Sequence, residues 1–292
     1  MRVPYQLTAA VQTEQRHEYM RIALETGFPR LKAIPIEDER SISIACYGPS
    51  LADTWRDLTH PIISVSGALK FLVERGIKPD YHVDVDPRLH KTKHISPPVE
   101  GVHYIMASCC HPEAWPLLRG QRVSLVHCYS SESTKAWIAE NDPAELLIQP
   151  GSTVGMAAIH VGGLLGYRHF EIHGMDGSFR DGKRHAGPHY GHPQGGYTWA
   201  AGGVTYDTSR IMSNGCAEVI NTCHMFPIFC VFHGNGLQQA LIAEEPNLPN
   251  AALAGTPDAD RVRKLRLVYE KPVQENQRIE DVEAEIRAML TA

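Results

Sequence analysis

The sequence lacks any apolar run close to the ~20 residues that a membrane-spanning helix needs. Residues 1–6 also lack the apolar centre of a signal peptide. We therefore expect no membrane span and a cytoplasmic location. Seven cysteines are present without any CxxC pair, so we expect reduced thiols rather than a zinc site built from cysteines.

Several nucleotide-associated and metal-associated patterns are also missing. The chain has neither the GxxxxGK[ST] phosphate loop nor the dinucleotide GxGxxG pattern, and it has no HExxH zinc motif. Its net charge is −5, and acidic and basic residues are interleaved, so no Lys/Arg stripe suggests nucleic acid as a partner. What remains is a chain of 292 residues, 43% hydrophobic, which is long enough for one large α/β domain with additions or for two small domains.

Short β-rich runs alternate with helical patterns from residue 41 onward. This alternation predicts an α/β fold with a mostly parallel sheet and helices on both faces. We expect a helical N-terminal extension over 1–40, a main α/β domain over 41–243, which the resemblance described below makes a Rossmann-like nucleotide-binding transferase domain, and a linker with a C-terminal helix over 244–292. Residues 176–206 are expected to be a long loop, rich in Gly, His and aromatic residues. The expected strands cover residues 41–46, 61–66, 81–86, 104–107, 123–128, 146–148, 169–174 and 226–232.

The first candidate site is the turn Gly48-Pro49-Ser50, which follows an expected strand and opens a helix. Exposed backbone N–H groups, a hydroxyl and the positive end of a helix dipole attract phosphate at such a turn. The alternative is an ordinary turn between a strand and a helix. Ser152 and Thr153 form a second helix entry, where the hydroxyls either bind a ligand or cap the helix.

Two carboxylates, Asp84 and Asp86, lie at the end of another expected strand. Side chains alternate along a strand, so both point to one face and could hold Mg²⁺ or Mn²⁺ against the oxygens of a pyrophosphate. The alternative is a pair of solvated carboxylates with Arg88 as a salt-bridge partner.

The segment from Gly174 to His192 is the richest in reactive side chains. Asp176 follows a strand end, and His185, His189 and His192 lie behind it. Histidine titrates near neutral pH and suits general acid or base catalysis, so we take these four residues as candidate catalytic groups. Metal binding by the histidines is the alternative.

The order of these motifs resembles the superfamily of the MptE-like, archaeal-type 6-hydroxymethylpterin diphosphokinases. That superfamily includes motility-associated flagellin glycosyltransferases, which are similar in fold to a class of bacterial sialyltransferases. The resemblance spans about residues 41–242, and Asp84-Val85-Asp86-Pro87 looks more like the glycosyltransferase branch. The segments that carry it are 47–51, 66–70, 76–80, 84–87, 151–155, 165–167, 174–176 and 181–185.

This resemblance implies a Rossmann-like nucleotide-binding fold and a transferase that uses an activated nucleotide. It implies a metal at Asp84 or Asp86. The stretch from His189 to His192 is similar to the one in which the sialyltransferases carry their catalytic histidine. Ser66 stands where relatives more often have Asp or Asn. The nucleotide contacts that we expect are Gly48, Pro49, Ser50, Ser66, Gly67, Ser152, Thr153 and Gly174.

Three functions are open from the sequence. The first is a glycosyltransferase-like enzyme, in which a histidine deprotonates a hydroxyl of a small-molecule or glycan acceptor. The second is a Mg²⁺-dependent pyrophosphokinase, which moves diphosphate from ATP to a hydroxymethylpterin-like substrate. The third is a non-catalytic nucleotide-binding module. The donor is ATP or a nucleotide-sugar, and a homo-oligomer is compatible with the sequence.

Overall fold

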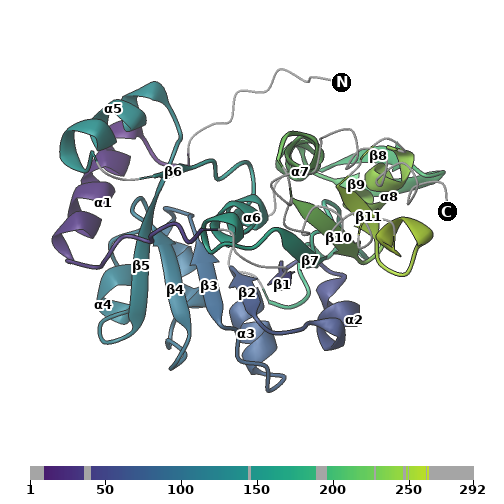
Figure 1. The fold of residues 1–292 in the computed structure, drawn as a ribbon, viewed down its shortest axis with the longest axis horizontal. Helices are drawn as coiled ribbons and strands as arrows, with labels where there is room; N and C mark the ends of the chain where they lie inside the picture. The colour runs from purple at the N-terminus through teal and green to yellow at the C-terminus, as the bar shows by residue number, and fades with distance from the viewer. Residues whose placement is uncertain are drawn as a thin grey trace, which may run out of the picture.

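A nine-stranded sheet organises the molecule (Figure 1). The computed structural model describes residues 10–35, 41–143, 146–188, 196–226, 228–245, 248, 250–260 and 262. From one edge to the other, the strands are β11 (Ala251–Leu253), β10 (Phe229–His233), β7 (His169–His173), β1 (Ser41–Ala45), β2 (Ile62–Val65), β3 (Tyr81–Asp84), β4 (His103–Ala107), β5 (Arg122–Cys128) and β6 (Leu147–Ile148).

Every neighbouring pair in this sheet is parallel. From β1 the chain builds outward to β6, and it then returns so that β7 pairs with the opposite side of β1. The order of the strands therefore reverses between β1 and β7. In open parallel sheets, the crevice beyond the carboxyl ends of the strands at such a reversal is the usual ligand position.

Helices cover both faces of the sheet, as the sequence predicts. The helices are α1 (Thr13–Glu25), α2 (Leu51–Thr54), α3 (Ala68–Val73), α4 (Ala114–Leu117), α5 (Glu132–Asn141), α6 (Val154–Leu164), α7 (Arg210–Met225) and α8 (Leu237–Glu244), with short 3₁₀ helices η1 (Trp55–Asp57) and η2 (Leu89–His94).

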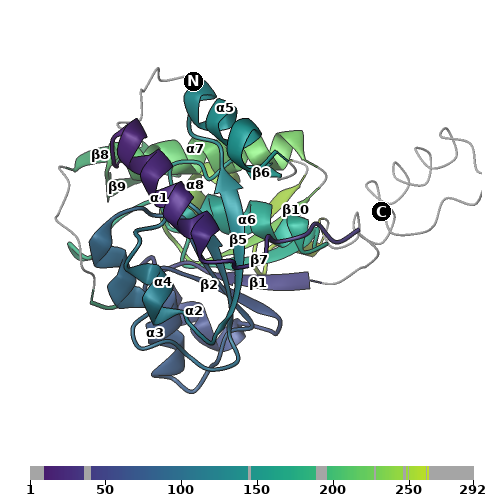
Figure 2. The same cartoon turned by 90° about the vertical axis from the view of Figure 1, so that its left-hand side faces the viewer.

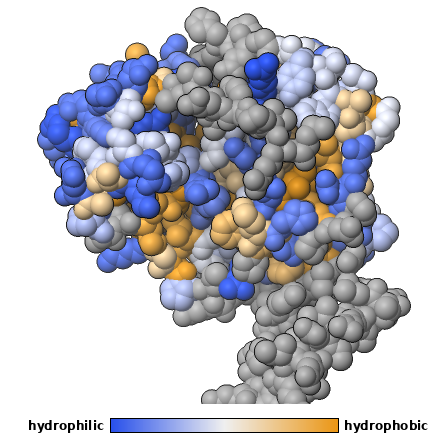
Figure 3. Space-filling model, turned by 90° about the horizontal axis from the view of Figure 1, so that it is seen from above, coloured by the Kyte–Doolittle hydropathy of each residue, from blue (hydrophilic) through white to orange (hydrophobic). Residues whose placement is uncertain are grey.

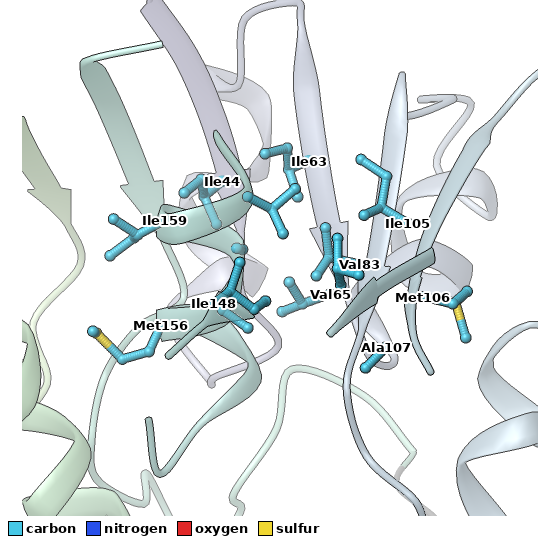
Figure 4. Close-up of a cluster of buried hydrophobic side chains, with 14 of the residues drawn as sticks. Ile44, Ile63, Val65, Val83, Ile105, Met106, Ala107, Ile148, Met156 and Ile159 are labelled. Carbon is cyan, nitrogen blue, oxygen red and sulfur yellow. The ribbon is translucent and has the colours of Figure 1, made fainter. Parts of the chain in front are cut away.

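Two hydrophobic clusters correspond to the two faces. Ile44 and Ile63 pack in the cluster that contains Met156 and Ile159 of α6 (Figure 4). The adjacent residues in the strands, Ala45 and Ile62, pack with α2 and α3 instead. Consecutive residues of one strand thus pack on opposite faces of the sheet. Because both faces are covered by helices, both sets of side chains are apolar, and the strand sequences are continuous apolar runs.

The N-terminal segment is built into the same core rather than lying apart from it. Met20 and Ala23 of α1 are buried in the α6-side cluster. The N–H of Leu31 donates to the carbonyl of Leu125 (2.9 Å), so the segment after α1 runs along β5. Helix α1 packs beside α5 near the β6 edge of the sheet (Figures 1 and 2).

Three predictions about organisation are corrected by the structure. The expected loop 176–206 contains β8 (Tyr197–Ala201), which forms an antiparallel hairpin with β9 (Val204–Thr208). Helices α4, α5 and α8 form where the sequence pattern predicted none. The expected linker from residue 244 contains β11, the edge strand beside β10, because Ala251, Ala252 and Leu253 pair with it.

The C-terminal helix predicted after residue 258 lies mostly outside the described residues. Ala259 and Val262, which are described, are buried against Phe229 and Val231 of β10. The sheet and its packing therefore extend past the predicted boundary at residue 243.

Among the residues that the structure describes, no helix combines the length and apolarity that crossing a bilayer requires. The face in Figure 3 shows apolar side chains in separate areas, with polar side chains between them.

Candidate functional site

A cavity of about 260 Å³ lies at the carboxyl ends of the central strands, where the strand order reverses. The segments after β1, β2, β3 and β7, the first turn of α6 and one side of α7 form its walls. Eight of the predicted site residues line it, namely Gly48, Ser66, Asp86, Ser152, Thr153, Gly174, Asp176 and His185. Pro49, Ser50, Gly67 and Asp84 do not line it, and His189 and His192 lie outside the described residues.

The Gly48–Ser50 turn is bound to the segment after β7. The N–H of Gly48 donates to the carbonyl of Gly174 (2.8 Å), and the N–H of Ser50 donates to Oδ2 of Asp176 (2.8 Å). The Ser50 hydroxyl donates to Oδ1 of the same carboxylate. Ser50 is fully buried, so Asp176 occupies the donors that the sequence assigned to phosphate. Burial raises the pKa of Asp176, while the hydrogen bonds from Ser50 lower it, and the net direction is upward.

Two glycines explain how the turn comes so close to β7. A Cβ on Gly48 would lie 2.4 Å from the carbonyl oxygen of Gly174. Gly174 has φ +68°, and its Cβ would lie 2.3 Å from the carbonyl oxygen of Cys46. Both positions therefore need glycine for the backbone contact itself.

The second predicted entry, before α6, is bound in a similar way. The N–H and the hydroxyl of Ser152 donate to the two oxygens of Glu218 on α7, at 2.6 and 2.7 Å. Thr153 is the N-cap residue, but its side chain makes no capping hydrogen bond. Neither hydroxyl therefore caps α6 as predicted, and the Ser152 hydroxyl bonds to Glu218 instead. Val154 and Gly155, in the first turn of α6, line the cavity.

Tyr47 and His185 form a stacked pair at the cavity wall, with ring centroids 5.2 Å apart and an interplanar angle of 18°. His185 Nδ1 lies 3.2 Å from the carbonyl oxygen of Tyr47. A Cβ on Gly67 would lie 2.2 Å from the Tyr47 ring, so Gly67 makes room for that ring. The neighbouring Ser66 lines the cavity with φ 47°, a left-handed conformation that is uncommon for a non-glycine residue.

The two aspartates after β3 differ in environment. Asp84 is buried, and burial raises its pKa to about 6; it borders a separate hollow of about 10 Å³. Asp86 bonds with Arg88 (2.8 Å) and lies 3.5 Å from Lys91. Burial alone would raise the pKa of Asp86, but the hydrogen bond from Arg88 and the charge of Lys91 bring it below its ordinary value.

A metal ion fits these surroundings poorly. Arg88 and Lys91 already neutralise Asp86, and Asp84 accepts the N–H of Asp86 (2.9 Å). Across the described residues, no group of three or more His, Cys, Asp or Glu side chains could hold a metal ion. A Mg²⁺ ion shared by one or two carboxylates and substrate phosphates would have to displace the two cations first.

Three basic side chains, Arg88, Lys91 and Arg184, line the cavity together. Burial, and then the positive charge of Arg88, lower the pKa of Arg184. Three cationic side chains against the one carboxylate of Asp86 leave an excess of positive charge, which favours an anionic group in this part of the cavity. The sequence suggested Arg184, together with Lys183, as a partner for phosphate charge, but it did not predict that Arg88 and Lys91 join Arg184 in one cavity.

The opposite wall is apolar and comes from α7. Ile211, Gly215 and Val219 share one helix face with Met212 and Cys216, and all five line the cavity. Sequence reasoning missed this wall as well. The spacing of small and apolar residues along 211–219 was the signal, because residues three and four apart lie on the same side of a helix.

A separate Ser-His-Asp chain lies away from this cavity. Ser108 Oγ is 2.7 Å from His127 Nδ1, and His127 Nε2 is 3.0 Å from Asp142 Oδ2. Ser108 and His127 are fully buried, and neither lines the cavity. The chain resembles a hydrolase triad in composition, but its serine has no access to substrate, so we assign it to stability.

The fold and the cavity define a Rossmann-like α/β protein with a cavity at the strand reversal. The chain belongs to the 6-hydroxymethylpterin diphosphokinase MptE-like family, whose model matches residues 16–182. The solved structure of the MAf glycosyltransferase from Magnetospirillum magneticum AMB-1 has a similar fold, with a TM-score of 0.60 and 14% sequence identity. That similarity covers 94% of this chain but only 42% of the glycosyltransferase, and no curated protein matches.

Proposed function

We propose that this protein is a nucleotide-dependent transferase of the glycosyltransferase-like kind, which moves a group from an activated nucleotide donor to a hydroxyl acceptor. The observation that carries the proposal is the divided lining of the cavity. Arg88, Lys91 and Arg184 supply positive charge, while α7 supplies an apolar wall. A nucleotide combines the two matching chemistries, an anionic phosphate and a flat, weakly polar base.

The phosphate fits the basic side chains better than the Gly48–Ser50 turn. The N–H groups of Gly48 and Ser50 are bonded within the protein, whereas Arg88, Lys91 and Arg184 bring three cationic side chains to the lining of the cavity. The first turn of α6 lies in the same wall, and the positive end of its dipole adds to the attraction. As the donor bond breaks, these groups would stabilise the negative charge that grows on the leaving phosphate.

His185 is the described histidine placed best to act as the base. A carbonyl only accepts hydrogen bonds, so the contact with Tyr47 places the proton of His185 on Nδ1. In that tautomer Nε2 is the basic ring nitrogen, and it takes the proton from the acceptor hydroxyl. The acceptor oxygen forms its bond to the transferred group, and the bond from that group to the nucleotide phosphate breaks. His189 and His192 stay predictions.

The family description supports a second candidate, a diphosphokinase that transfers diphosphate from ATP to a hydroxymethyl group. Mg²⁺ would supply charge neutralisation of the triphosphate in that reaction. The pairing of Asp86 with Arg88 and Lys91 speaks against this candidate.

A thermal-shift panel tests the proposal, with ATP, GTP, CMP, CDP, UDP and UDP-sugars, each with and without Mg²⁺. Stabilisation by a nucleotide without Mg²⁺ is expected, and Arg184→Gln should remove most of it. Arg119→Gln, a change at an exposed arginine outside the cavity, should leave the shift intact.

The outcomes separate the functions. Stabilisation by ATP only with Mg²⁺, together with release of AMP, would replace the proposal by the diphosphokinase. If the protein binds a nucleotide but turns over none of the donors, it is a non-catalytic nucleotide-binding module. No shift with any nucleotide would refute the proposal.

A further inference from the structure

Gln238 is a buried side chain of the cavity wall with an unused hydrogen-bond donor. It lies in the first turn of α8, and only 1% of its surface is exposed. Its backbone N–H donates to the carbonyl of Asp176 (2.9 Å), but its side-chain Nε2 has no hydrogen-bond partner among the described residues. A buried amide donor without an acceptor loses its hydrogen bonds to water without replacement, so native proteins rarely leave one unsatisfied.

The adjacent Gln239 shows how a glutamine is satisfied at this place in the fold. Its Nε2 donates to the carbonyl of His233 (3.0 Å), and its Oε1 accepts the N–H of Gly236 (2.9 Å). Gln239 therefore caps α8, and it does not line the cavity. The two neighbouring glutamines have different roles, and only Gln239 has a structural one.

The backbone at the start of α8 has little room to shift so that the Gln238 amide could find a hydrogen-bond partner within the protein. A Cβ on Gly236 would lie 2.5 Å from Asp176, so the helix backbone is already in close contact with that residue. Met212 and Cys216 of α7 lie beside the start of α8, since Gly177 adjoins both of them and the backbone N of Gln238, but neither bonds with the Gln238 amide donor.

Gln238 is far from the basic end of the cavity. It follows β10, whereas Arg88 follows β3, and three strands separate β10 from β3 in the sheet. Gln238 and Arg88 therefore line the cavity from strands that are not neighbours in the sheet. Asp176, whose backbone carbonyl accepts the N–H of Gln238, also lines the cavity, and none of the three basic cavity residues lies on α8 or directly after β10.

We propose that the side-chain amide of Gln238 donates a hydrogen bond to an acceptor atom, a ring nitrogen or a carbonyl oxygen, of a planar heterocycle bound against α7. The inference rests on the proposed function, since it assumes that a nucleotide fills the cavity. Beyond that function, the inference places the base of the nucleotide at the α8 end of the cavity and makes Gln238 one of the residues that select which base binds. A buried amide left without its acceptor discriminates strongly against ligands that lack one.

Calorimetric titration tests this assignment with AMP, CMP, GMP, UMP and inorganic pyrophosphate as probes. Gln238→Met keeps the length of the side chain and removes the donor, and Gln238→Glu keeps an acceptor in its place. Both variants should bind the preferred nucleotide at least tenfold more weakly while binding pyrophosphate as the wild-type protein does. Gln239→Met is the matched control and should lower the unfolding temperature without changing nucleotide affinity.

Unchanged nucleotide affinity in both Gln238 variants would overturn the inference and leave the proposed function standing. Binding of pyrophosphate but of no nucleotide by the wild-type protein would also overturn it, because no heterocycle would then be recognised. Failure of the wild-type protein to bind any of the five probes would overturn the proposed function together with the inference. Pyrophosphate binding by the variants shows at the same time that they are folded.

Discussion

Two acidic side chains each hold a serine by both its N–H and its hydroxyl group. Asp176 holds Ser50 after β1, and Glu218 holds Ser152 before α6. A carboxylate presents the same kind of oxygen acceptors as a phosphate, so turns with the sequence of a phosphate site can be stabilised from within the protein. The positions of these serines were predictable from the sequence, but their partners, 126 and 66 residues away, were not.

Asp84 gives a prediction about pH at the scale of a single residue. Burial raises its pKa from 3.8 to about 6, so the folded state disfavours its charge. Because the folded protein binds this proton more tightly than the unfolded chain does, Asp84 stabilises the fold fully at a pH below 3.8, the pKa in the unfolded chain. That stabilisation is lost as the pH rises from 3.8 to about 6. The loss is about 3 kcal/mol when the shift is complete.

Asp84→Asn should therefore gain in stability relative to the wild-type protein as the pH rises through this window. Urea unfolding of both proteins at about pH 4 and about pH 8 measures the change. The difference in unfolding free energy should move in favour of the variant by up to about 3 kcal/mol. A difference that is independent of pH would show that Asp84 does not titrate in this way.

At the scale of secondary-structure elements, the close contact between the ends of β1 and β7 shapes the cavity. Gly174→Ala should place a methyl group 2.3 Å from the Cys46 carbonyl at a φ of +68°. We expect a loss of about 2–5 kcal/mol, from the left-handed conformation and from the overlap together. Chemical unfolding measures this loss.

Gly76→Ala is the matched control for that substitution. Gly76 has φ +80°, but no atom lies within 4 Å of the added Cβ. Only the conformational cost of about 1–2 kcal/mol should appear there. Equal losses in the two variants would mean that the β1–β7 contact is not tight.

Much of the sheet was predictable because apolar strands and small-residue helices alternate regularly along the chain. Helix α6, with Ala157, Ala158 and Gly162 against the sheet, is a clear example. Strand β11 was missed because its three residues, Ala251, Ala252 and Leu253, sit among Pro, Asn and Ala and carry no β-branched side chain. It forms because β10 offers an open edge, and a single sequence does not reveal such a partner.

Within the site, residues at strand ends could be predicted and residues brought in from helices could not. Asp86, Ser152 and Asp176 follow strands, and their common edge follows from a parallel sheet. The α7 wall and Gln238 depend on how helices pack after the sheet has formed. For the Asp84–Asp86 pair, the sequence left a metal site and a salt bridge with Arg88 open; the structure has the Arg88 pair and adds Lys91, which the sequence did not suggest.

At the scale of the whole molecule, one cavity extends from the segment after β3 to the start of α8, across the strand reversal. Positive charge lies at the β3 side, and the α7 and α8 side is apolar with a buried amide. Under the proposed function, this arrangement would orient a nucleotide with its phosphate at the β3 side and its base at the α7 and α8 side. The similarity to the MAf glycosyltransferase covers only 42% of that protein, so a glycosyltransferase activity of this chain is a proposal.

The most direct test is a crystal structure of the protein with whichever nucleotide stabilises it in the thermal-shift panel. We predict that the phosphate lies within hydrogen-bond distance of Arg184 and of Arg88 or Lys91, with the base against α7. Phosphate bound instead at the Gly48–Ser50 turn, with Asp176 displaced from Ser50, or a nucleotide bound outside the cavity, would contradict the proposed site.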